Sequence, residues 1–133
     1  MNEGRDFEGG RYQLAQEVGF INRIVGNSYY PKILLDACCG RGSVSMSIKY
    51  SDFHTIGLDT NFLALKKFRE ESKGVSLSLG DALCMPFANI SIDCIIAIHC
   101  FDHLNRVQFL EECNRVLCDG GYLIFESLNR NSY

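Results

Sequence analysis

The chain alternates between short apolar runs and stretches in which apolar residues recur every three or four positions. Runs of the first kind, bounded by acidic or turn-forming residues, are typical of buried β-strands, and spacing of the second kind is typical of amphipathic helices. Strands are therefore predicted at residues 33–35, 54–58, 75–79, 92–98 and 122–125, the last extending as far as Ser127. The first two runs end directly at Asp36 and Asp59.

Four helices are predicted before or between these runs. Their apolar positions are Leu14, Val18, Ile21 and Val25; residues 43–50; Phe62, Leu65 and Phe68; and Val107, Leu110, Cys113 and Leu117. Residues 43–50 alternate serine with apolar residues as a strand would, but their position after a glycine loop favours a helix. The first helix is expected to end near Gly26-Asn27, Thr60 to cap the third, and Asp119-Gly120-Gly121 to stop the fourth.

Because strand and helix alternate throughout, the pattern predicts one α/β domain with an open parallel sheet and right-handed crossovers. Residues 1–133 are assigned to this single domain. Within it, residues 1–27 form an N-terminal helical segment and residues 33–127 form the ligand-binding core.

Composition excludes several classes of function. The hydrophobic fraction of 47% excludes a disordered chain, and 13 basic against 16 acidic residues, dispersed along the sequence, give no basic stripe for nucleic acid. The N-terminus lacks the pattern of a signal peptide, and no apolar stretch approaches the roughly 20 residues that a membrane span needs. We therefore expect a cytoplasmic protein with a small-molecule partner, no nucleic acid and no membrane.

Seven cysteines make the chain a candidate for metal or disulfide chemistry. An odd number without a signal peptide favours reduced thiols. Structural zinc usually takes paired C-x₂₋₄-C units, whereas Cys84, Cys94 and Cys100 stand singly and the adjacent Cys38-Cys39 pair would diverge. The sequence predicts packing cysteines and no metal.

The carboxylates that follow the first three strands give the first functional signal. In open parallel sheets ligands bind beyond the carboxyl ends of the strands, so Asp36, Asp59 and Asp81 should lie along one edge. Gly40 and Gly42 follow the first strand, where a ligand needs close approach to the backbone.

The spacing of the glycines in this loop limits the class of ligand. The loop lacks the third glycine of a dinucleotide-binding G-x-G-x-x-G fingerprint and the Gly-Lys-Ser/Thr of a P-loop. Asp59 follows Gly42 at the end of the second strand, where a carboxylate can accept hydrogen bonds from both hydroxyls of a ribose. The pattern therefore indicates a nucleoside without a pyrophosphate and opposes a nicotinamide-dependent oxidoreductase.

Four segments in order resemble the class I S-adenosylmethionine-dependent methyltransferases, in particular the small-molecule group. The segments are LLDACCGRG at 34–42, with Cys38 in the place of the first glycine; GLDT at 57–60; GDA at 80–82, followed by MPF at 85–87 and Ile92-Asp93; and FLEECNRVLCDGG at 109–121. The resemblance implies a Rossmann-like sheet with strand order 3-2-1-4-5 and helices on both faces.

The resemblance also implies a site for S-adenosylmethionine. Gly40 and Gly42 would admit its methionine and sugar, with Asp36 orienting the loop, and Asp59 would hold the ribose. Asp81 would meet the adenine amino group. The full implied set is Asp36, Cys38, Gly40, Gly42, Asp59, Thr60, Asp81, Ala82 and His99, where the backbone near His99-Cys100 faces the sulfonium.

The expected activity is methyl transfer to a small-molecule acceptor. Transfer from a sulfonium is a direct displacement, for which alignment suffices and a dedicated catalytic side chain is optional. His99 and His103 are candidate general bases for a hydroxyl or amine acceptor, and the alternative of a structural or pocket-lining histidine stays open. A cofactor-binding domain or partner subunit without turnover is the second interpretation.

The resemblance departs from the family at the C-terminus. Class I domains usually continue past the fifth strand with a helix and two more strands, whereas this sequence stops at Tyr133. Residues 122–125 would then form an uncovered apolar edge, which favours pairing with another chain. We expect either a truncated chain or a short form that dimerises or binds a partner subunit through this strand.

Overall fold

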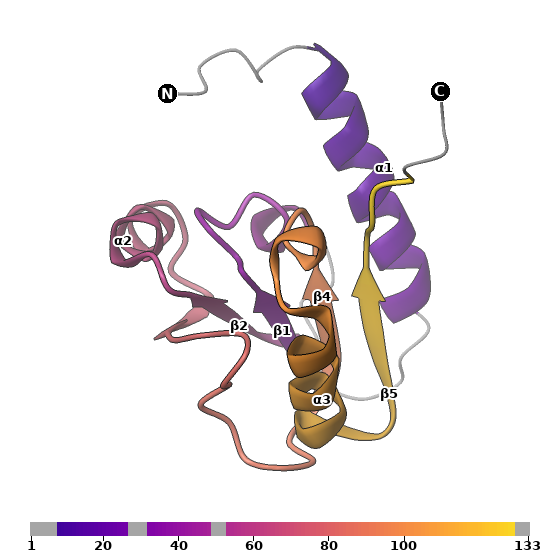
Figure 1. The fold of residues 1–133 in the computed structure, drawn as a ribbon. Helices are drawn as coiled ribbons and strands as arrows, with labels where there is room; N and C mark the ends of the chain where they lie inside the picture. The colour runs from indigo at the N-terminus through magenta and orange to yellow at the C-terminus, as the bar shows by residue number, and fades with distance from the viewer. Residues whose placement is uncertain (1–7, 27–31, 49–52, 130–133) are drawn as a thin grey trace.

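The computed structural model describes residues 8–26, 32–48 and 53–129. Its five strands form one parallel sheet with the order β3-β2-β1-β4-β5, which confirms the implied Rossmann-like topology (Figure 1). The strands are β1 Lys32–Ala37, β2 Phe53–Asp59, β3 Ser76–Leu79, β4 Ile92–Ala97 and β5 Leu117–Phe125.

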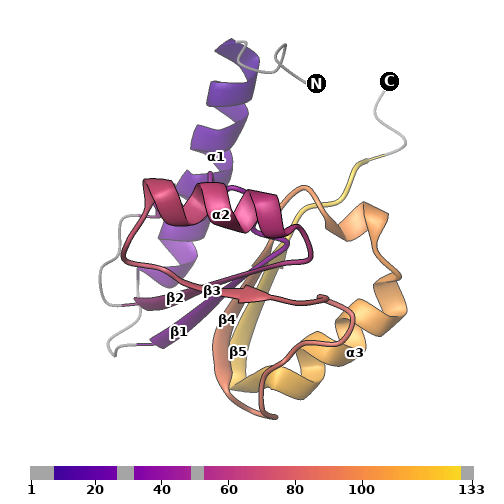
Figure 2. The same ribbon diagram turned by 90° about the vertical axis from the view of Figure 1, so that its left-hand side faces the viewer.

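Three α-helices cover the two faces of this sheet: α1 (Glu8–Val25), α2 (Phe62–Glu71) and α3 (Arg106–Val116). Successive strand residues point to opposite faces, so Leu34 packs with Ile21 of α1 while Leu35 packs with Phe109 of α3. Figure 2 shows α2 and α3 on opposite sides of the sheet. The expectation of helices on both faces is confirmed.

The helix α2 lies directly on the glycine positions of the neighbouring segments. Phe68 is fully buried, and its ring leaves no room for a side chain at Gly42 or Gly57. A Cβ atom at Gly57 would lie 2.9 Å from the thiol of Cys39 and 3.1 Å from the Phe68 ring. The absence of side chains at these glycines therefore lets Phe68 of α2 pack closely against the sheet and against the loop after β1.

The helix predicted at residues 43–50 is wrong over the part that the structure describes; residues 49–50, like residues 1–7 and Asn27 of the predicted N-terminal segment, lie outside it. Only a short 3₁₀ turn, η2 (Ser45–Ser47), forms, and Ile48 is extended. Serine side chains compete with helical hydrogen bonds: the Ser45 hydroxyl donates to Asp36, and that of Ser47 donates to the Ser43 carbonyl.

Two predicted helix boundaries are also wrong. Asn61, not Thr60, caps α2, because its side-chain oxygen accepts a hydrogen bond from the amide of Ala64 at 3.2 Å. The last helix ends at Val116, and Leu117 already pairs with Ile92 as the first residue of β5. The segment 119–121 lies within β5, where a register shift against β4 accompanies the positive φ of Gly120.

The strand β5 forms one edge of the sheet. Tyr122 and Phe125 are about half exposed, and Leu128 beyond the strand is 77% exposed, whereas Ile124 is buried in the cluster under α1. Pairing of this edge with another chain stays a prediction. In the part of the chain that the structure describes, every helix is too short or too polar to span a bilayer.

Candidate functional site

The loop after β1 turns sharply at the carboxyl edge of the sheet. Its backbone is left-handed at Cys38 (φ 58°), Gly40 (55°) and Gly42 (84°). For glycine this conformation is free of strain, but at Cys38 it costs about 1 kcal/mol. The amide of Cys39 donates to the carbonyl of Leu58 at 2.9 Å, so the turn is fastened to the end of β2.

Asp59 connects this loop to the start of α2. One carboxylate oxygen accepts a hydrogen bond from the Gly40 amide and the other from the Asn61 amide, both at 2.8 Å. Each oxygen retains a further lone pair for a ligand. The carboxylate is thus held rigidly between two turns, an arrangement suited to recognising a pair of hydroxyl groups.

Five of the predicted binding residues line one pocket of about 120 Å³ beside this loop. Its lining comprises Cys38, Leu58, Asp59, Thr60, Gly80, Asp81, Ala82 and Leu104. Asp81 is exposed, with one carboxylate oxygen accepting from the Leu83 amide at 2.8 Å, and Ala82 is buried. The pocket combines two carboxylates with apolar walls, which suits a flat ring that carries hydroxyl or amino donors.

Asp36 lies behind the loop and does not line this pocket. Its side chain is 3% exposed and accepts a hydrogen bond from the hydroxyl of Ser45, a contact that sequence reasoning missed because 43–50 was expected to be helical. Burial raises the pKa of Asp36 to about 7, the charge of Asp59 adds to the shift, and hydrogen bonds from Ser45 oppose it. Asp36 therefore holds the loop from inside the protein.

We predict that Asp36→Asn stabilises the fold above pH 7 and flattens its pH dependence. A folded-state pKa raised above the unfolded value makes the wild type lose stability as the pH rises from about 4 to about 7. The expected gain at pH 8 is on the order of 1–3 kcal/mol. Chemical denaturation at pH 5 and pH 8 measures it, and parallel wild-type and variant profiles would contradict the assignment.

The thiols around the site differ in reactivity because their surroundings differ. A hydrogen bond with Cys100 lowers the pKa of Cys38, although burial and the nearby aspartates oppose this. Burial instead raises the pKa of Cys94 and of Cys113 to about 12. Since the thiolate is the reactive form, we expect Cys38 to be the more reactive thiol of its pair with Cys100.

We predict that iodoacetamide modifies Cys38 faster than Cys118, which lies near the start of β5 and whose pKa is raised. A ligand seated in the pocket should protect Cys38 and leave Cys118 unchanged. Peptide mass spectrometry with and without S-adenosylhomocysteine measures both rates. Equal labelling of the two thiols would show that the Cys100 contact does not activate Cys38.

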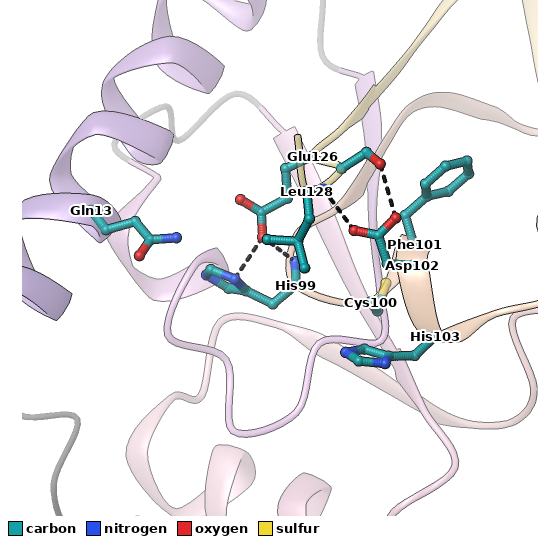
Figure 3. A pocket seen from close by; sticks show the side chains of 9 residues that line it. Gln13, His99, Cys100, Phe101, Asp102, His103, Glu126 and Leu128 are labelled. Atoms are coloured by element: carbon teal, nitrogen blue, oxygen red, sulfur yellow. Dashed lines mark hydrogen bonds and ion pairs between the residues drawn. The ribbon is translucent and has the colours of Figure 1, made fainter. Parts of the chain in front are cut away.

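A second pocket, of about 200 Å³, lies next to the ends of β4 and β5 and contains His99 and His103 (Figure 3). Its lining comprises Gln13, His99, Cys100, Phe101, Asp102, His103, Glu126, Ser127 and Leu128. The structure therefore places His99 apart from the five predicted cofactor residues of the first pocket, and Asp36, Gly40 and Gly42 line neither of the two pockets. Of the thiols discussed above, Cys38 lines the first pocket and Cys100 the second.

His99 is held between two carboxylates. Its backbone is left-handed (φ 65°), its amide donates to Glu126 at 2.7 Å, and Nδ1 lies 2.5 Å from the same carboxylate oxygen. Nε2 lies 3.2 Å from the carboxylate of Glu17, whose pKa is raised chiefly by burial. Sequence reasoning missed this grouping, because α1, β4 and β5 bring the three residues together from distant positions.

Asp102 shapes the opposite side of the second pocket. Its carboxylate accepts hydrogen bonds from the Leu128 amide at 2.7 Å, the Ser127 hydroxyl at 2.8 Å and the Arg106 guanidinium at 2.7 Å. These contacts lower the pKa of Asp102, and the hydrogen bond from the Leu128 amide has the largest effect. They fasten the segment after β5 to the turn η3 (Phe101–His103).

Comparison with known families gives one matching domain model, described as a methyltransferase domain, over residues 35–125. A phthiotriol/phenolphthiotriol dimycocerosates methyltransferase of Mycobacterium tuberculosis is 35% identical over 109 residues, 76% of this chain and 39% of that protein. Ajmaline N-methyltransferase of Rauvolfia serpentina is 32% identical over 106 residues, which cover 73% of this chain and 36% of that protein. The chain thus spans roughly two fifths of the length of such relatives.

Solved structures share the fold at lower identity. Geranyl diphosphate C-methyltransferase from Streptomyces coelicolor, solved with Mg²⁺, geranyl-S-thiolodiphosphate and S-adenosylhomocysteine, superposes with a TM-score of 0.74 at 18% identity, covering 84% of this chain and 42% of that one. Coclaurine N-methyltransferase, bound to N-methylheliamine and S-adenosylhomocysteine, superposes with a TM-score of 0.73 at 18% identity. The superposition covers 84% of this chain and 35% of that one.

Proposed function

The chain belongs to the methyltransferase domain family of class I S-adenosylmethionine-dependent folds, and from this we propose that it binds S-adenosylmethionine and methylates a small-molecule acceptor. The observation that carries the proposal is the first pocket, where Asp59, Asp81 and Ala82 converge beside the left-handed glycine loop. These residues come from the ends of β2 and β3, where such sheets bind ligands.

The residues of this pocket fit an adenosine group. Asp59 would accept hydrogen bonds from the ribose hydroxyls, since the amides of Gly40 and Asn61 already fix its orientation. The exposed carboxylate of Asp81 would accept from the adenine amino group, and buried Ala82 would border the ring.

The glycine loop fits the remainder of the cofactor. A Cβ atom built on Gly40 meets nothing within 4 Å, so open space lies beside the backbone at that position. The loop would bind the methionine portion there, and Asp36 would keep it in place through Ser45. When bound, S-adenosylmethionine supplies an electrophilic methyl group on a positively charged sulfur.

We assign the second pocket to the acceptor. It lies at the end of β4, and Phe101 and Leu128 offer apolar contact while His99 and Asp102 offer polar contact. Holding a nucleophile in line with the methyl group supplies much of the acceleration of such a displacement. Both ring nitrogens of His99 already contact carboxylates, so for a hydroxyl or amine acceptor His103 would receive the proton.

Calorimetric titration of the purified chain with S-adenosylhomocysteine tests the cofactor assignment, with NAD as the matched control. We expect saturable one-to-one binding of S-adenosylhomocysteine and none of NAD. A folded chain that binds neither would refute the proposal. Incubation with methyl-labelled S-adenosylmethionine and a panel of amines and phenols then separates an enzyme from a domain that only binds the cofactor.

A further inference from the structure

Three side chains with metal-binding atoms meet beside the proposed acceptor pocket. Glu17 comes from α1, His99 follows β4, and Glu126 follows β5. One ligand atom from each lies within 4.8 Å of those of the other two. Figure 3 shows His99 and Glu126 in contact at the side of the pocket that faces α1.

The packing of this group concentrates negative charge. The side chains of Glu17 and Glu126 are 11% and 32% exposed, and both contact the imidazole of His99. Two partly desolvated carboxylates at one position repel each other, which favours a cation placed between them. Burial, with a smaller contribution from this repulsion, raises the pKa of Glu17. An imidazolium balances only one of the two charges, and Arg106, near the same pocket, is paired with Asp102.

We propose that Glu17, His99 and Glu126 form a binding site for a divalent transition-metal ion of the Mn²⁺ or Zn²⁺ type. One imidazole nitrogen and two carboxylates suit such ions, which accept mixed nitrogen and oxygen ligands. Ligand atoms of a tetrahedral ion with bonds of about 2.1 Å lie about 3.4 Å apart. The three atoms lie within 4.8 Å of one another, so side-chain rotations would have to bring them up to about 1.4 Å closer to reach that spacing. The seven cysteines, the metal candidates in the sequence, take no part.

Three protein ligands leave coordination positions open for water or for a ligand. If the second pocket holds the acceptor, a premise that rests on the proposed function, an oxygen of the acceptor can occupy such a position. The ion would then orient the acceptor and lower the pKa of a bound hydroxyl. Acceptors with an oxygen near the methylated atom are therefore the favoured class.

The test is a titration of the chelator-treated chain with Mn²⁺, followed by calorimetry and by electron paramagnetic resonance of the free ion. Mn²⁺ is chosen because it prefers oxygen and nitrogen to thiolate ligands, which avoids binding by the cysteines. We expect one Mn²⁺ per chain, and a Kd raised at least tenfold by each of Glu17→Gln, His99→Gln and Glu126→Gln.

Two matched controls keep the result specific. His103→Gln removes a second histidine of the same pocket, and Glu70→Gln removes an exposed carboxylate on α2; both should leave Mn²⁺ binding unchanged. Thermal unfolding of each variant verifies the fold. Absence of saturable Mn²⁺ binding, or equal losses in variants and controls, would overturn the site. Because the titration contains no S-adenosylhomocysteine, its result is independent of the cofactor proposal.

Discussion

Replacing Asp59 with alanine is expected to weaken the binding of S-adenosylhomocysteine by about 100-fold or more. The carboxylate would lose its hydrogen bonds to the ribose, and each hydrogen bond to a charged group contributes about 1.5–3 kcal/mol. The Gly40 amide would also lose its partner at 2.8 Å, so the loop itself would loosen. Two such bonds correspond to roughly 3–6 kcal/mol, and about 1.4 kcal/mol is a tenfold change in Kd.

Calorimetry on two further variants makes this result interpretable. Asp59→Asn retains one oxygen acceptor but turns an amide group toward the Gly40 or the Asn61 amide, so an intermediate loss of binding is expected. Asp119→Ala removes an exposed carboxylate in β5, remote from the pocket, and should bind as the wild type does. Wild-type affinity in Asp59→Ala would show that the nucleoside does not bind in the first pocket.

The strands were predictable because their signals are local and repeat, whereas their order was implied by the resemblance to the methyltransferase family. Each buried run is short, and the apolar residues of 33–35 and 92–98 identify central strands covered on both faces. The meeting of the aspartates at one edge of the sheet follows from the parallel arrangement, since parallel strands all end on the same side. Asp59 and Asp81 accordingly lie in one pocket.

What the sequence could not supply depends on contacts across the fold. The helix expected at 43–50 is replaced by a turn, because the Ser45 hydroxyl bonds to Asp36. The grouping of Glu17, His99 and Glu126 has no spacing signal at all, since it depends on how α1 docks against the ends of β4 and β5. Local patterns and the family resemblance therefore indicated the residues of the first pocket and the two histidines of the second, but not the grouping around His99.

The two glycines of the loop after β1 differ in what surrounds them. A substitution at Gly42 should therefore mainly lower the stability of the fold, and one at Gly40 should mainly weaken ligand binding. Gly42 has φ 84°, and a Cβ atom there would lie 2.3 Å from the ring of Phe68, which is fully buried. Gly40 has φ 55° and open space around it. The same substitution at the two positions should therefore have different consequences.

Gly42→Ala is expected to destabilise the fold by about 2–5 kcal/mol, since overpacking and a strained backbone each cost roughly 1–3 kcal/mol. Thermal unfolding should show a Tm lowered by about 10 °C or more. Phe68→Leu in the same chain removes the ring that clashes and should recover part of this loss relative to Phe68→Leu alone. Unchanged stability in Gly42→Ala would mean that α2 does not pack on the loop as the structure shows.

Gly40→Ala carries only the backbone strain of about 1 kcal/mol, so its Tm should fall by a few degrees. Its methyl group would project into the space that we assign to the cofactor, because no protein atom lies within 4 Å. Binding of S-adenosylhomocysteine should therefore weaken by about tenfold or more, well beyond the change in stability, since an added methyl group in a filled site costs roughly 1–3 kcal/mol. Wild-type affinity in this variant would place the ligand elsewhere.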